Sequence, residues 1–259
     1  MAANTQAAAS AVAEAARQGA EFVALPENVC LMPEDAAEAR ARALPEEAHP
    51  AVAALCDAAA SAGVWLLGGT VGVRADGGRL ANRSLLISPD GAVAARYDKI
   101  HMFDVDISEE RTYQESETYR PGERAVVAGL PWAKLGMTVC YDLRFPTLYR
   151  ALAQAGAALL AVPSAFTATT GKAHWHVLLR ARAIETGCYV LAPAQCGSHP
   201  GGRRTFGHSL MVSPWGEVIA EAGDEPGIIT AKLDPAQVTE ARQRIPSLVN
   251  DRAYAPPMS

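Results

Sequence analysis

Apolar residues and turn-forming residues alternate along the chain in a pattern that predicts helices and strands in turn. The first half predicts helices over residues 4–18 and 51–63, strands over 21–25 and 64–73, and two strands within 82–99 around a Ser-Pro-Asp-Gly turn. The second half predicts strands over 135–140, 158–165, 188–195 and 227–233, helices over 146–156, 172–187 and 235–245, and a hairpin over 209–222. This alternation predicts one α/β domain over residues 1–259, with a long loop over 100–123.

Composition narrows the class of protein. The 259 residues are 49% hydrophobic and 20% charged, which excludes wholesale disorder and fits a globular chain. The net charge is −5 and no basic block occurs, so we expect neither a nucleic-acid partner nor a membrane partner. Five cysteines at irregular spacings are typical of reduced thiols rather than of a disulfide framework, which predicts a cytoplasmic protein.

Three side chains with complementary chemistry stand at predicted strand ends. Cys140 lies at a strand-to-helix turn, Glu27 follows strand 21–25, and Lys99 ends the second strand of 82–99. Taken singly, each is more simply a buried thiol, a turn carboxylate or a solvated lysine. Taken together they suggest catalysis, because a carboxylate can take the proton of a thiol nucleophile while an ammonium stabilises an oxyanion.

The segments around these residues resemble the signature segments of the nitrilase (carbon–nitrogen hydrolase) superfamily. They read LPEN, RYDKIHMFD and GMTVCYDLRFP, and they stand in the family's order and spacing. The resemblance implies an αββα sandwich of four layers in a single domain, pairing into a homodimer or a higher homo-oligomer and using no cofactor and no metal. Family members begin with a strand of the type V-A-x-x-Q, whereas here a helix follows Met1 almost at once, so we expect that strand to be missing.

The resemblance also assigns roles to residues. Cys140 is expected to be the nucleophile that forms a thioester, and Glu27 the group that takes its proton and passes it to the leaving group. Lys99 and the N–H of Tyr141 are expected to hold the oxyanion. A further family glutamate precedes a Pro-Gly pair, and Glu115 matches it better than the neighbouring Glu117.

The later segments resemble the amidases that hydrolyse deaminated glutathione. They are PSAFTATTGKAHWHVLLRARAIETGCYVLAPAQCG and RRTFGHSLMVSPWGEV. The expected reaction is therefore hydrolysis of a small linear amide to a carboxylate and ammonia. Arg203 and Arg204 are expected to bind substrate carboxylates, with a solvated loop as an equal alternative. Further residues expected to line the substrate pocket are Tyr141, Arg144, Ser164, Phe166, Thr170 and Trp175.

Several alternatives remain open at this point. The chain has the signatures expected also of an ω-amidase, an N-carbamoyl amide hydrolase or a nitrilase of the same superfamily. A catalytically inactive interaction protein with this fold is a second possibility, and a cysteine–histidine hydrolase of the papain type is a third. His174 and His176 stand two residues apart on a predicted helix and point in different directions, which predicts no metal site from this pair.

Overall fold

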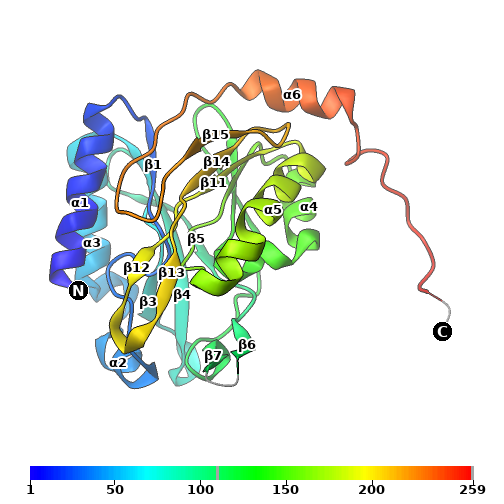
Figure 1. Ribbon diagram of the computed structural model, residues 1–259. Coiled ribbons are helices and arrows are strands. Elements are labelled where there is room, and N and C mark those ends of the chain that lie inside the picture. The colour runs from blue at the N-terminus through cyan, green and yellow to red at the C-terminus, as the bar shows by residue number, and fades with distance from the viewer. Residues whose placement is uncertain (109–110, 258–259) are drawn as a thin grey trace.

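Two β-sheets pack face to face in the computed structural model, which describes residues 1–108 and 111–257, and helices cover the outer face of each sheet (Figure 1). The helices α1 (Ala2–Arg17) and α3 (Pro50–Ala62) lie outside the first sheet, and α4 (Pro146–Gln154) and α5 (Ala168–Thr186) lie outside the second. The four-layer αββα sandwich expected from the sequence is therefore the observed fold. Within residues 1–108 and 111–257, no helix combines the length and the apolar character needed to cross a bilayer.

The first sheet contains five strands. They are β1 (Phe22–Ala24), β2 (Trp65–Leu67), β3 (Val71–Arg74), β4 (Leu80–Ile87) and β5 (Val93–Asp98). Strand β1 runs parallel to β2, and β4 pairs antiparallel with β2, β3 and β5. Helix α3 begins at Pro50, where the missing N–H costs nothing, and ends at Gly63, which adopts the left-handed conformation with φ 66°.

The second sheet contains six strands. In spatial order they are β15 (Val218–Glu221), β14 (Leu210–Val212), β11 (Tyr189–Ala192), β10 (Leu159–Ala161), β9 (Lys134–Met137) and β8 (Val126–Gly129). Strands β9, β10 and β11 are parallel, joined by crossovers that contain α4 and α5. These central strands are covered on both faces, which explains why their sequences are continuous apolar runs. The last helix, α6 (Pro235–Arg244), follows this sheet.

The largest apolar cluster includes residues of both sheets and of helices α4 and α5. Leu86 and Tyr97 of the first sheet belong to the same buried cluster as Leu135, Met137 and Leu160 of the second. A smaller cluster, which includes Val12 and Leu55, lies between the first sheet and its helices. The shared interior keeps the two sheets in a fixed relation, which matters because the candidate site draws residues from both.

The structure differs from the sequence-based prediction in three stretches. The strand expected over 64–73 is divided into β2 and β3, because the chain turns at Gly69, where φ is +64° and a Cβ would lie 2.0 Å from the Pro26 carbonyl oxygen. The expected loop over 100–123 contains β6 (Asp104–Ser108) and β7 (Arg111–Gln114). The strand expected over 227–233 is wrong: the segment is extended but pairs with no strand among the described residues.

Besides short 3-10 helices, one further α-helix and three further β-strands of the described residues lie in segments for which the sequence pattern predicts neither a helix nor a strand. They are α2 (Ala36–Arg42), β8, β12 (Cys196–Ser198) and β13 (Arg204–Phe206). Strands β12 and β13 form a separate hairpin with antiparallel pairing.

Candidate active site

A cavity of about 310 Å³ opens where the residues that follow β1, β5 and β9 come together. Glu27, Lys99 and Cys140 all line it, as does Glu115. The four residues expected to be catalytic, far apart in the sequence, therefore share one cavity. A volume of this size suits a small organic ligand.

Cys140 sits at a sharp turn between β9 and a short 3-10 helix, η4 (Cys140–Arg144). Its φ is 49°, a left-handed value that is uncommon for a residue with a side chain, and its N–H donates to the Pro163 carbonyl at 2.9 Å. The turn places the thiol in the cavity, and the first N–H groups of η4, including that of Tyr141, lack partners within the helix.

Glu27 is a buried carboxylate, only 2% exposed. Its Oε1 accepts hydrogen bonds from Lys99 Nζ at 3.1 Å and Asn82 Nδ2 at 2.9 Å, and its Oε2 accepts from the Ala165 N–H at 2.9 Å. Burial alone raises the pKa of Glu27, but the charges of Lys99 and Arg203 and a hydrogen bond with Cys140 outweigh it, so the pKa lies below its ordinary value. Glu27 is therefore ionised at neutral pH.

Lys99 is held between two carboxylates. Its Nζ lies 2.8 Å from Glu115 Oε2 and 3.1 Å from both Glu115 Oε1 and Glu27 Oε1. Burial lowers the pKa of Lys99, but the charges of Glu115 and Glu27 prevail and raise it well above its usual range. Glu115 is fixed in turn by the Phe103 N–H, which donates to its Oε2 at 2.7 Å. Glu117, the alternative considered from sequence, is exposed and makes no such contact with Lys99.

The Cys140 thiol rests in its neutral form. Burial raises its pKa, and the negative charge of Glu27 raises it further, while Lys99 only partly offsets these effects. The thiol proton therefore lies beside an ionised carboxylate that can receive it as the sulfur forms a new bond. Such an arrangement favours proton transfer during attack over a standing thiolate.

A second buried carboxylate, Asp142, fixes the nucleophile turn against the end of β5. Its Oδ2 accepts hydrogen bonds from Tyr97 Oη at 2.6 Å and the Val139 N–H at 2.8 Å, and its Oδ1 accepts from the His101 N–H at 3.0 Å. Tyr97 and His101 flank Lys99 in the sequence. Asp142 therefore sets the position of the thiol relative to the ammonium.

Four of the residues expected to bind substrate line the cavity: Tyr141, Phe166, Thr170 and Arg203. Arg203 contacts the wall closely, since its Nη2 donates to the Ala165 carbonyl at 2.9 Å and its guanidinium lies 5.7 Å from the centre of the Tyr113 ring. Its Nε is buried and has no hydrogen-bond partner among the described residues.

The other four expected residues are not part of the cavity lining. Ser164 is fully buried, and its Oγ donates to the Val162 carbonyl at 2.9 Å. Trp175 is also fully buried and packs behind Phe166, with 4.9 Å between ring centres. Arg144 lies over the rings of Tyr141 and Phe166, and Arg204 is exposed on β13. Ser164 and Trp175 are close in sequence to residues that line the cavity, but their side chains pack in the interior next to that lining and do not reach the cavity.

Sequence reasoning missed Asn82, Tyr113 and Tyr119, which line the cavity. Asn82 is buried and donates to both Glu27 and Glu115. Asn82 lies in β4 directly before Arg83 and Ser84, so its polar side chain does not stand out in the sequence. No histidine lines the cavity within residues 1–108 and 111–257, so a cysteine–histidine pair of the papain type has no support there.

The cavity holds a buried neutral thiol, an ionised carboxylate and an ammonium. These are the groups that acyl transfer through a cysteine requires. A family model for carbon–nitrogen hydrolases matches residues 1–243, and the chain belongs to that family. It is therefore a hydrolase of carbon–nitrogen bonds other than peptide bonds.

Individual relatives agree with this assignment. A deaminated glutathione amidase from Synechocystis sp. is 43% identical over 252 residues, covering 95% of this chain and 91% of the relative. The omega-amidase NIT2 of Homo sapiens is 38% identical over 247 residues, covering 94% of this chain and 87% of the relative. Among solved structures, Nit3 of Saccharomyces cerevisiae, a member of the nitrilase superfamily, superimposes with a TM-score of 0.85 at 32% identity, covering 94% of this chain and 88% of that one.

Proposed function

We propose that this chain is an amidase that cleaves a small linear amide through a thioester on Cys140, with deaminated glutathione as the first substrate to test. One observation carries the proposal: Cys140, Glu27, Lys99 and Glu115 line a single cavity, with Lys99 bonded to both carboxylates. Family membership alone would leave the working residues unassigned.

Acylation begins as the Cys140 sulfur attacks the amide carbon and Glu27 takes the thiol proton. The carbonyl oxygen becomes an oxyanion, which the Lys99 ammonium and the N–H of Tyr141 stabilise. Glu27 then gives its proton to the amide nitrogen, the carbon–nitrogen bond breaks as the carbonyl re-forms, and ammonia leaves from a primary amide or an amine from a substituted one. Glu115 keeps Lys99 oriented throughout, because both of its oxygens contact Nζ.

Deacylation uses the same groups in reverse. Glu27, ionised again, takes a proton from a water molecule as that water attacks the thioester carbon. The second oxyanion is held as the first was. The carbon–sulfur bond then breaks, the proton held by Glu27 returns to the sulfur, and the product leaves as a carboxylic acid that ionises in solution, with a neutral thiol left behind.

Arg203 supports a substrate that carries a carboxylate. It is the arginine in the cavity lining, and its buried Nε lacks a partner among the described residues. An anionic group beside this guanidinium would supply the missing acceptor in a geometry that arginine favours. The named activities of the relatives from Synechocystis sp. and Homo sapiens both fit this chemistry.

The substrate class is tested by measuring the turnover of several candidate amides by the purified chain. Deaminated glutathione, 2-oxoglutaramate and an N-carbamoyl amide are compared by kcat/KM, with detection of the released peptide amine or of ammonia as each substrate requires. We expect deaminated glutathione to give the highest value. A preference for 2-oxoglutaramate would indicate an ω-amidase, and a preference for the carbamoyl compound would indicate an N-carbamoyl amide hydrolase.

The residue assignment has its own control. Cys140→Ala should abolish turnover of every substrate while leaving the thermal unfolding transition intact, and Cys56→Ala on α3 should retain turnover. Because Glu27 can take the thiol proton as the sulfur forms a bond, an electrophile that fits the cavity should label Cys140 in preference to the other four cysteines, and substrate should slow this labelling. Absence of both turnover and selective labelling would favour the inactive interaction protein.

Two further features of the proposal concern assembly and location. Exposed apolar side chains on α5 and the β14–β15 hairpin, Val177, Ile184 and Trp215, support pairing of two chains across this face. Light scattering should give a dimer mass, and Val177→Glu should lower it.

The five free cysteines support a reducing compartment, the cytoplasm, which fractionation of cells expressing the chain can check.

A further inference from the structure

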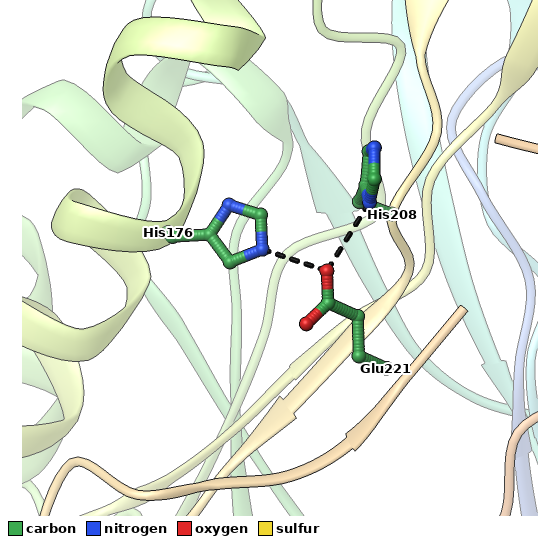
Figure 2. A group of neighbouring side chains, drawn as sticks. All are labelled: His176, His208 and Glu221. Carbon is green, nitrogen blue, oxygen red and sulfur yellow. Dashed lines mark hydrogen bonds and ion pairs between the residues drawn. The ribbon is translucent and has the colours of Figure 1, made fainter. Parts of the chain in front are cut away.

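Three potential metal ligands meet outside the cavity, on the face formed by α5 and the β14–β15 hairpin. They are His176 on α5, His208 just before β14, and Glu221 at the end of β15 (Figure 2). Figure 2 shows one nitrogen of each ring directed at the carboxylate. His176 Nε2 lies 2.9 Å from Glu221 Oε1, and His208 Nδ1 lies 3.1 Å from the same oxygen.

The side chains around the cluster hold the two rings in place. The Phe206 ring packs against His208, with 4.2 Å between centres and 33° between planes, and meets His176 edge-on at 6.1 Å. The His208 backbone is clamped as well, because its carbonyl accepts from Trp175 Nε1 at 2.8 Å and its N–H donates to the Gly223 carbonyl at 2.9 Å. With φ at 55°, His208 adopts a left-handed conformation that these contacts maintain.

The donor set and its spacing suit a divalent transition metal. The three candidate ligand atoms all lie within 4.8 Å of one another. Bonds of about 2.0–2.1 Å in a tetrahedral arrangement place ligand atoms roughly 3.4 Å apart, so only small movements of exposed side-chain ends are needed. Imidazole nitrogen with one carboxylate is typical of zinc and its neighbours, whereas calcium and magnesium prefer all-oxygen sites.

We propose that His176, His208 and Glu221 bind a divalent late first-row metal ion, with Zn²⁺ the first candidate and water completing the coordination. All three side chains are partly exposed in the single chain, so a hydrated ion can reach them before two chains pair across the same face. Bound metal would join α5 to the β14–β15 hairpin within one chain.

The proposal goes beyond the amidase chemistry and does not depend on it. The cluster is separated from the cavity by Trp175 and Phe166, and none of its three members lines the cavity. Cys140 is a competing ligand for zinc, so the experiment must distinguish nitrogen–oxygen coordination from thiolate coordination.

The test titrates the full chain with Co²⁺, a spectroscopic substitute for Zn²⁺, and then with Zn²⁺ by calorimetry. Both are done on the wild-type chain and in the Cys140→Ala background. We expect one ion per chain in both backgrounds, cobalt bands without a thiolate-to-metal charge-transfer band, and a rise in Tm with metal. His176→Gln is the decisive variant, because glutamine still donates a hydrogen bond to Glu221 but is a poor metal ligand.

His176→Gln and Glu221→Gln should each weaken binding by at least about tenfold, since even the loss of an outer partner of a metal ligand typically costs that much. The matched control is His174→Gln on the same helix, two residues away and outside the cluster, which should bind as the wild type does. Equal binding by wild type and His176→Gln, or a thiolate charge-transfer band that disappears in Cys140→Ala, would overturn the proposal. A folded melting curve for each variant excludes loss of structure as the cause.

Discussion

Replacing Glu27 by glutamine separates two effects that this carboxylate has on Cys140. The carboxylate is the proposed proton acceptor, and it is also a negative charge that raises the pKa of the thiol. Glu27→Gln should therefore reduce turnover and yet lower the pKa of Cys140, because the charge of Lys99 stays in place. A purely electrostatic role would not reduce turnover while making the thiol easier to ionise.

The magnitudes follow from the hydrogen bonds at the site. Loss of a positioned general base typically reduces rate by about 10²- to 10⁴-fold, or roughly 2.7 to 5.4 kcal/mol in the activation free energy. Three donors, on Lys99, Asn82 and Ala165, converge on the two oxygens of Glu27. Glutamine offers a single acceptor oxygen, so at least one buried donor faces an NH₂ group, and we expect about 1–3 kcal/mol of lost unfolding free energy.

The assay combines steady-state turnover with the pH dependence of alkylation of Cys140 by iodoacetamide. The variant should show lower kcat/KM at every pH and an alkylation curve displaced to lower pH than in the wild type. Asn82→Ala serves as the control, because it also removes a partner from this hydrogen-bond group but keeps the carboxylate charge, so its alkylation curve should move less. Unchanged turnover in Glu27→Gln, or a curve displaced to higher pH, would refute the reasoning.

Three other outcomes are expected. Arg203→Met should raise KM for a carboxylate-bearing amide about 10- to 100-fold, since a hydrogen bond to a charged group contributes about 1.5–3 kcal/mol, and should change KM for an uncharged amide little. Gly171→Ala should lower the unfolding free energy by about 1–3 kcal/mol in denaturant titrations, because its Cβ would lie 2.3 Å from Phe206 Cβ, whereas Gly129→Ala, with open space around it, should stay within about 0.5 kcal/mol. The raised pKa of Cys140 stabilises the fold fully below the ordinary thiol pKa of about 8.5 and loses this effect above it, by up to about 1.4 kcal/mol per pH unit. The unfolding free energy should therefore fall less steeply above that pH in Cys140→Ala than in the wild type.

The shared location of Glu27, Lys99 and Cys140 could be predicted from the sequence, because each stands at a position that local pattern identifies; their catalytic roles stay a prediction. Glu27, Lys99 and Cys140 each follow an apolar segment whose end is marked by a change to polar residues, and the structure places all three around one cavity. Glu115 was found only through the resemblance to a family, since nothing in its own loop distinguishes it from Glu117.

Cavity-lining residues outside the three motifs were harder to predict, because their positions depend on how segments distant in sequence pack. Asn82 lies in β4 directly before Arg83 and Ser84, and only the packing of β4 against its neighbours brings it to the carboxylates. Ser164 and Trp175 show the opposite error. They were expected in the pocket because they are near the site in sequence, but both are fully buried and do not line the cavity. The strand predicted over 227–233 failed for a related reason: an alternating pattern makes a strand only where a neighbour offers hydrogen bonds.

The division of the site between two sheets has a consequence for biosynthesis. Glu27, the proposed proton acceptor, and Lys99 follow strands of the first sheet, whereas Cys140 follows a strand of the second. A nascent chain that has completed only its N-terminal layers carries no competent nucleophile, and an isolated second layer would hold a thiol with no proton acceptor. The proposed chemistry therefore requires both layers to have docked.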